Sequence, residues 1–321
     1  MHDSLLIINA GSSSIKFAVY AVAGATSDPR PLLRGQIAGI GGDATFCVND
    51  AAGTAHSIDG QSAIANHVDA INRILTWLPS RLSDTRLVGA GHRVVHGGPH
   101  HSAPCLITKQ TLAELEALTT LAPHHQPHNL AAIAALGKLD PTLPQVACFD
   151  TAFHTTQSAT AKRLPLPREY ADTHGLQRYG FHGLSYAFIR DALARRDDVP
   201  DTARILIAHL GHGASLCATR AGRSVATTMG FSTLDGLMMG TGGVGENVVM
   251  VCARIADRLT WLGMTVSASA NAAHADLIST PDSSVKAWVI PTNEELAIAR
   301  LTRAALARST TGDRLHDATA C

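Results

Sequence analysis

The sequence predicts an α/β protein built from two similar halves. Apolar segments of strand length alternate with segments in which apolar residues recur at helical spacing, and this alternation is typical of α/β folds. A strand, a turn of small residues and a second strand occur near the start of the chain, and the same arrangement returns after residue 203. A pattern that recurs in both halves indicates a duplicated architecture.

The two strand–turn–strand units are defined by composition. In the first, Leu5–Ile8 and Phe17–Tyr20 are rich in strand formers, and the small polar residues of Asn9–Lys16 join them. The second unit consists of a strand of buried type at Arg204–Leu210, a turn at Gly211–Gly213 and a strand at Ala214–Thr219. Each unit is therefore expected to form a pair of adjacent strands.

Further elements follow from spacing and from the residues that end them. Ile64–Leu78 has apolar residues at helical spacing and stops before Pro79. The other expected elements are helices at Thr111–Leu121, Leu130–Leu139 and Asn293–Arg308, and strands at Leu87–Val95 and Gln145–Phe149. The last residues, Ser309–Cys321, are expected to be frayed or disordered.

Proline-rich breaks suggest where the chain divides. Pro141–Pro144 and Pro165–Pro167 bracket a boundary near residue 150. The sequence therefore predicts a first domain over residues 1–149 and a second domain over residues 150–321. The helix over 293–308 is expected to pack back on the first domain.

Composition excludes several kinds of partner. Basic and acidic residues both number 26 among the 321 residues, and aromatic residues make up 4%. A nucleic-acid partner is not expected, because it needs clustered positive charge and stacking platforms. No apolar stretch reaches membrane-spanning length and no signal peptide is evident. The six cysteines stand singly, so a cytoplasmic protein without a membrane partner is expected.

The first turn has the composition of a phosphate-binding loop. Gly11 lets the backbone approach a ligand, Ser12 and Ser14 supply hydroxyl groups, and Lys16 supplies a positive charge. The alternative is an ordinary polar hairpin turn. The second turn could bind phosphates from the other side, through residues His209, Gly211, His212 and Gly213.

Three further side chains have the chemistry of a phosphoryl-transfer site. Arg93 ends an apolar strand, where it could bind a carboxylate or phosphoryl group, although a structural salt bridge is the alternative. Asp150 ends another strand, a place where α/β sheets often hold a metal. His182 lies between glycines and could donate to a phosphoryl oxygen, although such residues are more often caps or buried polar groups.

Two other interpretations are weaker. His124 and His128 have helical spacing, but no acidic or thiol partner accompanies them as a zinc site would require. The segment 240–245 matches GxGxxG, which suggests a dinucleotide-dependent oxidoreductase. Leu237–Met239 before it is a poor strand, however, and no acidic residue ends a strand about 20 residues later.

Together the motifs resemble the acetate kinases and related short-chain acyl kinases. The matching stretches are LLIINAGSSSIKFAVY, GHRVVHGG, LAPHHQPHNL, CFDTAFHTT, RYGFHGLSY, IAHLGHGASL, STLDGLMMGT, GGVGEN and ISTPDSSVKAWVIPTNEELAIAR. The resemblance implies the duplicated, ribonuclease H-like fold shared by actin, Hsp70 and sugar kinases, and a homodimer. It implies a reaction of ATP with acetate that forms acetyl phosphate and ADP, with Mg²⁺.

The resemblance also assigns the acyl substrate and phosphate to the domain over residues 1–149 and the nucleotide to the domain over residues 150–321, and it implies roles for individual residues. Asp150, His182, Arg93 and His125 would be catalytic, with Arg93, Val95 and Phe181 contacting the acyl substrate. Asn9 and Glu294 would serve the metal. The nucleotide would contact Lys16, Ser12, Ser14, His209, Gly211, His212, Gly213, Gly243, Gly245 and Glu246.

One departure from the family pattern is large. After Thr241 the chain passes directly into a motif that lies far downstream in the family, so about 80 residues are missing and the second domain is shortened. The resemblance places a second catalytic arginine and part of the adenosine site in that segment. His124 and Thr233 replace apolar residues beside the acyl group. Propionate or another short acid is therefore an alternative substrate, and a catalytically degenerate nucleotide-binding relic is an alternative function.

Overall fold

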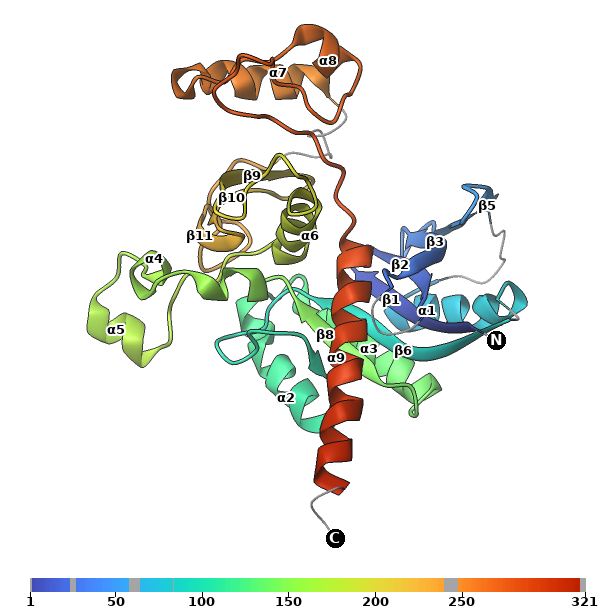
Figure 1. Ribbon diagram of the computed structural model, residues 1–321. Coiled ribbons are helices and arrows are strands. Elements are labelled where there is room, and N and C mark those ends of the chain that lie inside the picture. The colour runs from blue at the N-terminus through green and yellow to red at the C-terminus, as the bar shows by residue number, and fades with distance from the viewer. Residues whose placement is uncertain (1, 24–26, 58–63, 83, 240–247, 318–321) are drawn as a thin grey trace. The chain divides into compact units, whose positions relative to one another are not determined.

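The computed structural model describes residues 2–23, 27–57, 64–82, 84–239 and 248–317, with side chains to residue 309 (Figure 1). The chain forms two compact units. Unit 1 comprises Met1–Thr155 together with Glu294–Cys321, and unit 2 comprises Thr156–Asn293. The division falls six residues after the boundary expected from the sequence, and the last helix, α9 (Glu294–Asp317), belongs to unit 1.

Unit 1 is built on a sheet whose described strands have the order β5-β4-β3-β2-β1-β6-β8-β7. Strands β1 to β5 pair antiparallel with one another in sequence order. Strand β6 pairs parallel with both β1 and β8, and β7 pairs antiparallel with β8. The strands are β1 (His2–Ala10), β2 (Ser14–Ala21), β3 (Arg30–Ala38), β4 (Thr45–Asp50), β5 (Ala55–Ser57), β6 (Thr85–Val94), β7 (Cys105–Leu106) and β8 (Gln145–Phe149). The parallel arrangement brings the carboxyl ends of β1, β6 and β8 to one edge of the sheet.

Helices cover both faces of this sheet. They are α1 (His67–Trp77), α2 (Lys109–Ala117) and α3 (Gln126–Leu139), the short helices η1 (Leu78–Ser80), η2 (Leu118–Leu121) and η3 (Ala152–Thr156), and α9. Alternate residues of a strand point to opposite faces. Ala90 of β6 shares a core with Ala132 of α3 and Ile71 of α1, whereas Gly89 and Gly91 lie against α9. Figure 1 shows α9 crossing the face of the strands opposite to α3.

Capping fixes where α1 begins. Asn66 Oδ1 accepts a hydrogen bond from the backbone N–H of Asp69 at 3.0 Å, and Asp69 Oδ2 accepts one from the N–H of Ala65 at 3.1 Å. This reciprocal pairing satisfies donors that the first turn of a helix leaves without partners. The capping fixes the residue at which α1 starts. That first residue, His67, contacts the carbonyl oxygen of Gly11 in the first turn of the chain.

Unit 2 contains a smaller antiparallel sheet of described order β11-β10-β9. Its elements are α4 (Ala159–Lys162), α5 (Arg168–Thr173), α6 (Gly183–Leu193), β9 (Arg204–Leu210), β10 (Ala214–Arg220), β11 (Arg223–Thr227), α7 (Val249–Arg258), η4 (Thr260–Leu262) and α8 (Ala268–Ala272). Helix α6 packs against β9. The antiparallel arrangement of β9, β10 and β11 repeats that of β1, β2 and β3.

The expected strands and helices are present within a few residues of their expected bounds, with two corrections. The strand Arg204–Leu210 is not buried, because Leu206 is 54% exposed and β9 lies at an edge of the described sheet. The end of the chain is not frayed from Ser309, since α9 continues to Asp317. Once packing has formed the first turns of a helix, each further residue adds one hydrogen bond, so extension of the helix is easier than its initiation.

Candidate functional site

Four of the predicted residues form one hydrogen-bonded chain in unit 1. Arg93, in β6, donates from Nε and Nη2 to Asp150 Oδ2 at 2.9 and 2.6 Å. Its Nη1 donates to Asn9 Oδ1 at 3.3 Å, and Asn9 Nδ2 donates to Glu294 Oε2 at 3.2 Å. Because β1, β6 and β8 end at the same edge of the sheet and α9 begins there, residues from four distant segments meet.

Burial strengthens the electrostatic interactions within this hydrogen-bonded chain of side chains. The side chain of Asp150 is 1% exposed and that of Arg93 19% exposed, so water screens their attraction weakly. Burial lowers the pKa of Arg93, but Asp150 and Glu294 outweigh it, so that the pKa is raised overall. Burial, together with the charges of Asp150 and Glu295, raises the pKa of Glu294 despite the opposing effect of Arg93. The site therefore holds more negative charge than Arg93 balances.

The charge of Arg93 also acts on His125. It precedes α3 as its N-cap residue. Burial, and then repulsion by Arg93, lower its pKa. The imidazole is therefore neutral near pH 7, and a neutral ring can donate one hydrogen bond and accept another.

The donors in this region fit Mg²⁺ better than Zn²⁺. Magnesium is usually held by one or two carboxylates together with waters and substrate phosphates, and Asp150 and Glu294 offer two carboxylates. Among the described residues, no group of three or more His, Cys, Asp or Glu side chains is arranged to hold a metal. The ring of His128, one of the two histidines considered for zinc, stacks on His67 with centroids 4.6 Å apart.

The first turn presents its polar groups outward. Lys16 and Ser12 are exposed, and Ser14 is half-buried. The backbone N–H of Gly11 donates to the carbonyl of Ser14 at 2.7 Å, which closes the turn. The side chains of Ser12 and Lys16 therefore remain accessible to solvent.

The sequence interpretation missed two residues that hold this turn and the strand beside it. His67 Nε2 lies 2.6 Å from the carbonyl oxygen of Gly11. Asn129 Nδ2 donates to the carbonyl of Ala10 at 2.6 Å, and its Oδ1 accepts from the N–H of Val95 at 3.0 Å. Both are buried polar residues on helices, a combination that indicates hydrogen bonding rather than simple packing.

In unit 2, His182 is held in a strained conformation. It caps the start of α6 with φ of 59°, in the left-handed region that residues other than glycine rarely adopt. Its Nδ1 lies 2.8 Å from Ser215 Oγ, which also bonds to the hydroxyl of Tyr186. Strain held by surrounding bonds is often found at functional sites. The sequence interpretation assigned Ser215 to the second turn but did not predict its contact with His182.

The glycines of the second turn make room for two imidazole rings. A Cβ atom on Gly213 would lie 2.9 Å from His182 Nε2, and one on Gly211 would lie 3.0 Å from His209 Nε2. The two rings stack with centroids 4.1 Å apart, and His209 Nδ1 lies 3.0 Å from Ser185 Oγ. The turn thus packs against histidines, and the exposed His212 forms its tip.

The remaining predicted residues fall into two groups. Val95, in unit 1, and Phe181, in unit 2, are both almost fully buried, as side chains of an apolar wall would be. Gly243, Gly245 and Glu246 lie outside the described residues, as does the GxGxxG segment. Their predicted contacts with the nucleotide stay predictions.

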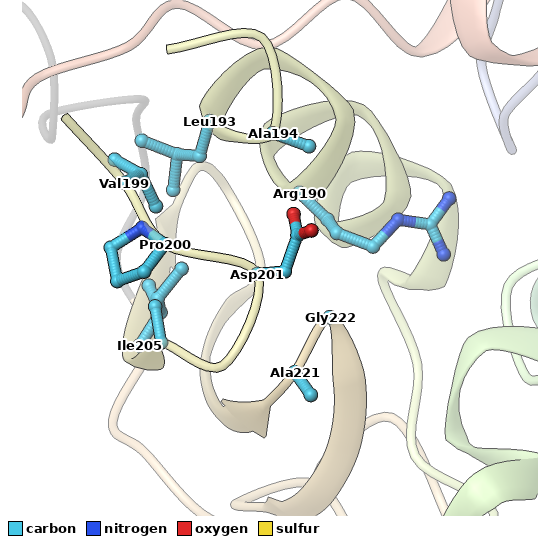
Figure 2. A pocket seen from close by; sticks show the side chains of 10 residues that line it. Arg190, Leu193, Ala194, Val199, Pro200, Asp201, Ile205, Ala221 and Gly222 are labelled. Atoms are coloured by element: carbon cyan, nitrogen blue, oxygen red, sulfur yellow. The ribbon is translucent and has the colours of Figure 1, made fainter. Parts of the chain in front are cut away.

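Unit 2 also contains a pocket. It has a volume of about 250 Å³ and lies between the end of α6, the loop before β9 and the turn after β10. Figure 2 shows the aliphatic side chains of Leu193, Val199 and Ile205 around it, with Asp201 pointing inward. None of the predicted site residues lines it.

The described helices include none that is both long enough and apolar enough to cross a membrane.

Comparison with known proteins gives a consistent match. A model of the acetokinase family matches residues 4–242 and, as a second piece, residues 241–300. The acetate kinase of Rhodopseudomonas palustris is 36% identical, over 94% of this chain and 98% of that protein. The acetate kinase of Methylocella silvestris is 34% identical, over 95% and 98%.

Solved structures agree. A propionate kinase from Francisella tularensis superimposes with a TM-score of 0.84 at 26% identity, covering 94% of this chain and 99% of that one. The acetate kinase of Porphyromonas gingivalis has the same fold, with a TM-score of 0.81, 24% identity and coverage of 95% and 100%. The duplicated fold expected from the sequence is thereby confirmed.

The comparisons also locate the missing segment. The alignment with the Rhodopseudomonas protein has 392 positions. Because 94% of 321 residues is about 302, about 90 of those positions have no residue of this chain opposite them. The two pieces of the family match meet at residues 241–242, the junction expected from the sequence.

Proposed function

The chain belongs to the acetokinase family, and from that premise we propose that it transfers the terminal phosphoryl group of ATP to acetate, forming acetyl phosphate and ADP. One observation carries the proposal: Asp150, Arg93, Asn9 and Glu294, which come from four segments, form a continuous hydrogen-bonded chain. Polar side chains from four distant segments are not expected to form such a chain by chance.

Each residue of unit 1 has a defined task in this proposal. Arg93 would bind the acetate carboxylate and then the transferring phosphoryl group, for which a guanidinium has suitable geometry. Asp150 and Asn9 fix the guanidinium in place before substrate arrives. Such positioning accounts for much of the rate in phosphoryl transfer, since little covalent chemistry falls to the protein.

The imidazoles and the lysine would stabilise charge. His125 and His182 would donate hydrogen bonds to phosphoryl oxygens, and Ser215 would keep Nδ1 of His182 occupied so that Nε2 is the donor. Lys16 and the hydroxyls of Ser12 and Ser14 would contact the nucleotide phosphates. Val95 and Phe181 would contact the methyl group of acetate.

Glu294, Asp150 and Asn9 would hold Mg²⁺ directly or through water. The metal would supply charge neutralisation for the phosphates of ATP. The raised pKa of Glu294 supports this assignment, because a buried carboxylate with excess negative charge nearby is stabilised by a cation. We also propose a cytoplasmic homodimer, in keeping with the use of ATP and with the family resemblance.

The missing segment sets the expected rate. The resemblance places a second catalytic arginine there, and by analogy with arginine fingers its loss lowers kcat by on the order of 10³-fold. We therefore propose slow turnover compared with full-length acetate kinases. The same observation favours a second candidate function, nucleotide binding without turnover.

Hydroxylamine trapping of acyl phosphate tests the proposal. The purified chain is incubated with ATP, Mg²⁺ and either acetate or propionate, and the variants Arg93→Lys and His182→Ala are run beside it. Arg86→Lys, in an exposed ion pair with Asp3, is the matched control for the arginine substitution. Circular dichroism establishes that each variant is folded.

The outcomes separate the candidates. Turnover that is lost in Arg93→Lys and His182→Ala but kept in Arg86→Lys supports the kinase, and the preferred acid identifies the substrate. A folded chain that binds ATP in calorimetry without forming acyl phosphate overturns the kinase proposal in favour of the nucleotide-binding function.

A further inference from the structure

Unit 1 holds a second cluster of reactive side chains, at the edge of the described sheet opposite to β5. Cys105 begins β7, the strand at that edge. Its Sγ lies 3.7 Å from Nδ1 of His101, within hydrogen-bonding range for sulfur. The other ring nitrogen, Nε2, lies 3.1 Å from Oε2 of Glu114 in α2. A thiol, an imidazole and a carboxylate therefore follow one another across the cluster.

Separate contacts hold each member of the cluster. The ring of His101 stacks on the ring of Phe149, with centroids 5.2 Å apart. Cys105 is held by the pairing of β7 with β8. Oε1 of Glu114 accepts a hydrogen bond from Nε2 of Gln110 at 2.9 Å. Because the loop before β7, the strand itself and α2 each contribute one side chain, the arrangement depends on the folded unit.

The geometry is that of a proton relay rather than of a metal site. The thiol and the carboxylate approach different nitrogens of His101, so the three groups do not point at one ion, as metal ligands must. A nucleophile, a base within hydrogen-bonding range and a third group beside that base form the arrangement that activates nucleophiles in many enzymes. The cluster therefore has the parts needed to activate a thiol.

Cys105 needs such a base in order to react. Partial burial and the charge of Glu114 raise the pKa of its thiol, so little thiolate, the reactive form, exists at neutral pH without help. His101 can take the proton. Oε2 of Glu114 is not aligned with Nε2 as a hydrogen bond, and the carboxylate therefore stabilises the protonated ring through its charge.

We propose that Cys105 undergoes reversible thiol–disulfide exchange with small disulfides that carry amino groups. Nδ1 of His101 takes the thiol proton, and Sγ attacks one sulfur of the reagent. The new S–S bond forms as the reagent's own S–S bond breaks, and the departing sulfur keeps the electron pair and takes the proton from His101. The products are a mixed disulfide on Cys105 and one free thiol. Cys105 is oxidised, and the departing half of the reagent is reduced.

The charge of Glu114 selects the class of reagent. Its side chain is 45% exposed, so a small molecule can approach it from solvent. A cationic disulfide is attracted to the carboxylate and an anionic one is repelled, and salt weakens both effects. Free thiols reverse the exchange, so the modification is transient wherever thiols are abundant.

Three disulfides of similar size test the charge preference: cystamine is cationic, hydroxyethyl disulfide is neutral and dithiodipropionate is anionic. Mass spectrometry of the peptide that contains Cys105 gives the rate constant for each at low salt. The rate constants should fall in that order. Glu114→Gln should lower the ratio of the cationic to the anionic rate constant about fivefold or more, the effect of one unit charge at close range in water. Glu116→Gln, at an exposed glutamate of the same helix, is the matched control and should preserve the ratio.

His101→Gln tests the base, with hydroxyethyl disulfide as the reagent. In the unchanged chain Cys105 should react faster than Cys47, although Cys47 is exposed and Cys105 is half-buried. The substitution should slow Cys105 about tenfold at neutral pH, because little thiolate forms without the base, and should leave Cys47 unaffected. The difference should shrink as the pH rises, since the thiol then ionises unaided. His100→Gln, at the exposed neighbouring histidine, is the matched control.

Cys148 reports the state of the fold in the same experiments. It is fully buried, and burial raises its pKa to about 12, so it stays unmodified while the chain is folded. The comparison of Cys105 with Cys47 needs no variant and holds even if a substitution unfolds the chain. Slower reaction of Cys105 than of Cys47, an unchanged rate in folded His101→Gln, or a charge preference that survives Glu114→Gln would each overturn the proposal.

Discussion

Gly91 of β6 lies directly beneath Thr302 of α9. A Cβ atom on Gly91 would overlap Oγ1 of Thr302 and would lie 2.9 Å from Cγ2 of Ile298. Thr302 and Ile298 are fully buried. The helix therefore approaches the backbone of the sheet closely, and the glycine allows that approach.

Gly91→Ala should destabilise the protein by about 1–3 kcal/mol, the usual range for an overpacked core. Chemical unfolding monitored by circular dichroism measures the change. Adding Thr302→Ala should recover part of the loss, because the crowded hydroxyl is removed. Gly42→Ala, where a Cβ would have only a backbone contact at 3.8 Å, is the control. Equal unfolding midpoints for Gly91→Ala and Gly42→Ala would contradict the prediction.

The buried ion pair should matter far more to stability than an exposed one. Asp150→Asn removes the carboxylate to which Arg93 bonds directly, and breaking a buried pair typically costs about 3–5 kcal/mol. Asp3→Asn removes a carboxylate from a pair whose side chains are 65% and 45% exposed, which should cost less than about 1 kcal/mol. Urea unfolding at neutral pH compares the two variants. Similar losses would show that the Arg93–Asp150 pair is well solvated.

Gly213→Ala should impair the proposed catalysis without unfolding the chain. A methyl group there would lie 2.9 Å from His182 Nε2, so the ring must move away from the position that Ser215 fixes. A displacement of this size in a positioned group is expected to lower kcat by on the order of 10²-fold. Gly211→Ala, which crowds His209 instead, separates the two rings. Normal kcat in Gly213→Ala at an unchanged melting temperature would argue against a role for His182.

Buried histidines should make the protein sensitive to mild acid. Burial lowers the pKa of His92 and of His96 from 6.5 to about 4. Each is therefore neutral in the fold and gains a proton more readily when unfolded, so its contribution is complete above pH 6.5 and is lost as the pH falls toward 4. Between pH 7 and 5 each should remove about 2 kcal/mol of stability.

His92→Leu is the test of that pH dependence. The variant should lose less unfolding free energy between pH 7 and 5 than the unchanged chain, since one of the two protonation sites is gone. Urea titrations at both pH values give the comparison. An identical loss in the variant would mean that other groups control the acid sensitivity.

The sequence predicted the strands that are apolar along their whole length. Leu5–Ile8 and Gln145–Phe149 were located because parallel strands buried on both faces are continuously apolar. The strands β3 and β4 were missed, because polar residues and a glycine interrupt their apolar positions. Leu206 was expected to be buried, since its local sequence resembles a central strand, and seven residues do not reveal that β9 lies at an edge of the described sheet.

Some features of the candidate site could likewise be predicted from the sequence, and others could not. Arg93 and Asp150 were identified because each ends an apolar strand, and parallel strand ends meet at one edge. The contacts of His67 and Ser215 were missed because their partners lie 56 and 33 residues away in the sequence. A hydrogen bond between distant segments has no local signature, so only the folded chain reveals which side chains hold the turn and the imidazole.

The position of α9 in the chain has a consequence for folding during synthesis. Residues 2–155 leave the ribosome with one face of their sheet uncovered, and the helix that seals it follows only after all of unit 2 has been made. Chains fold from the N-terminus as they emerge, and contacts between distant segments form slowly. One face of the unit 1 sheet therefore stays uncovered until α9 is synthesised, 138 residues later. The exposed strand β9 emerges from the ribosome during that interval. Aggregation during expression is expected to depend on how quickly α9 arrives.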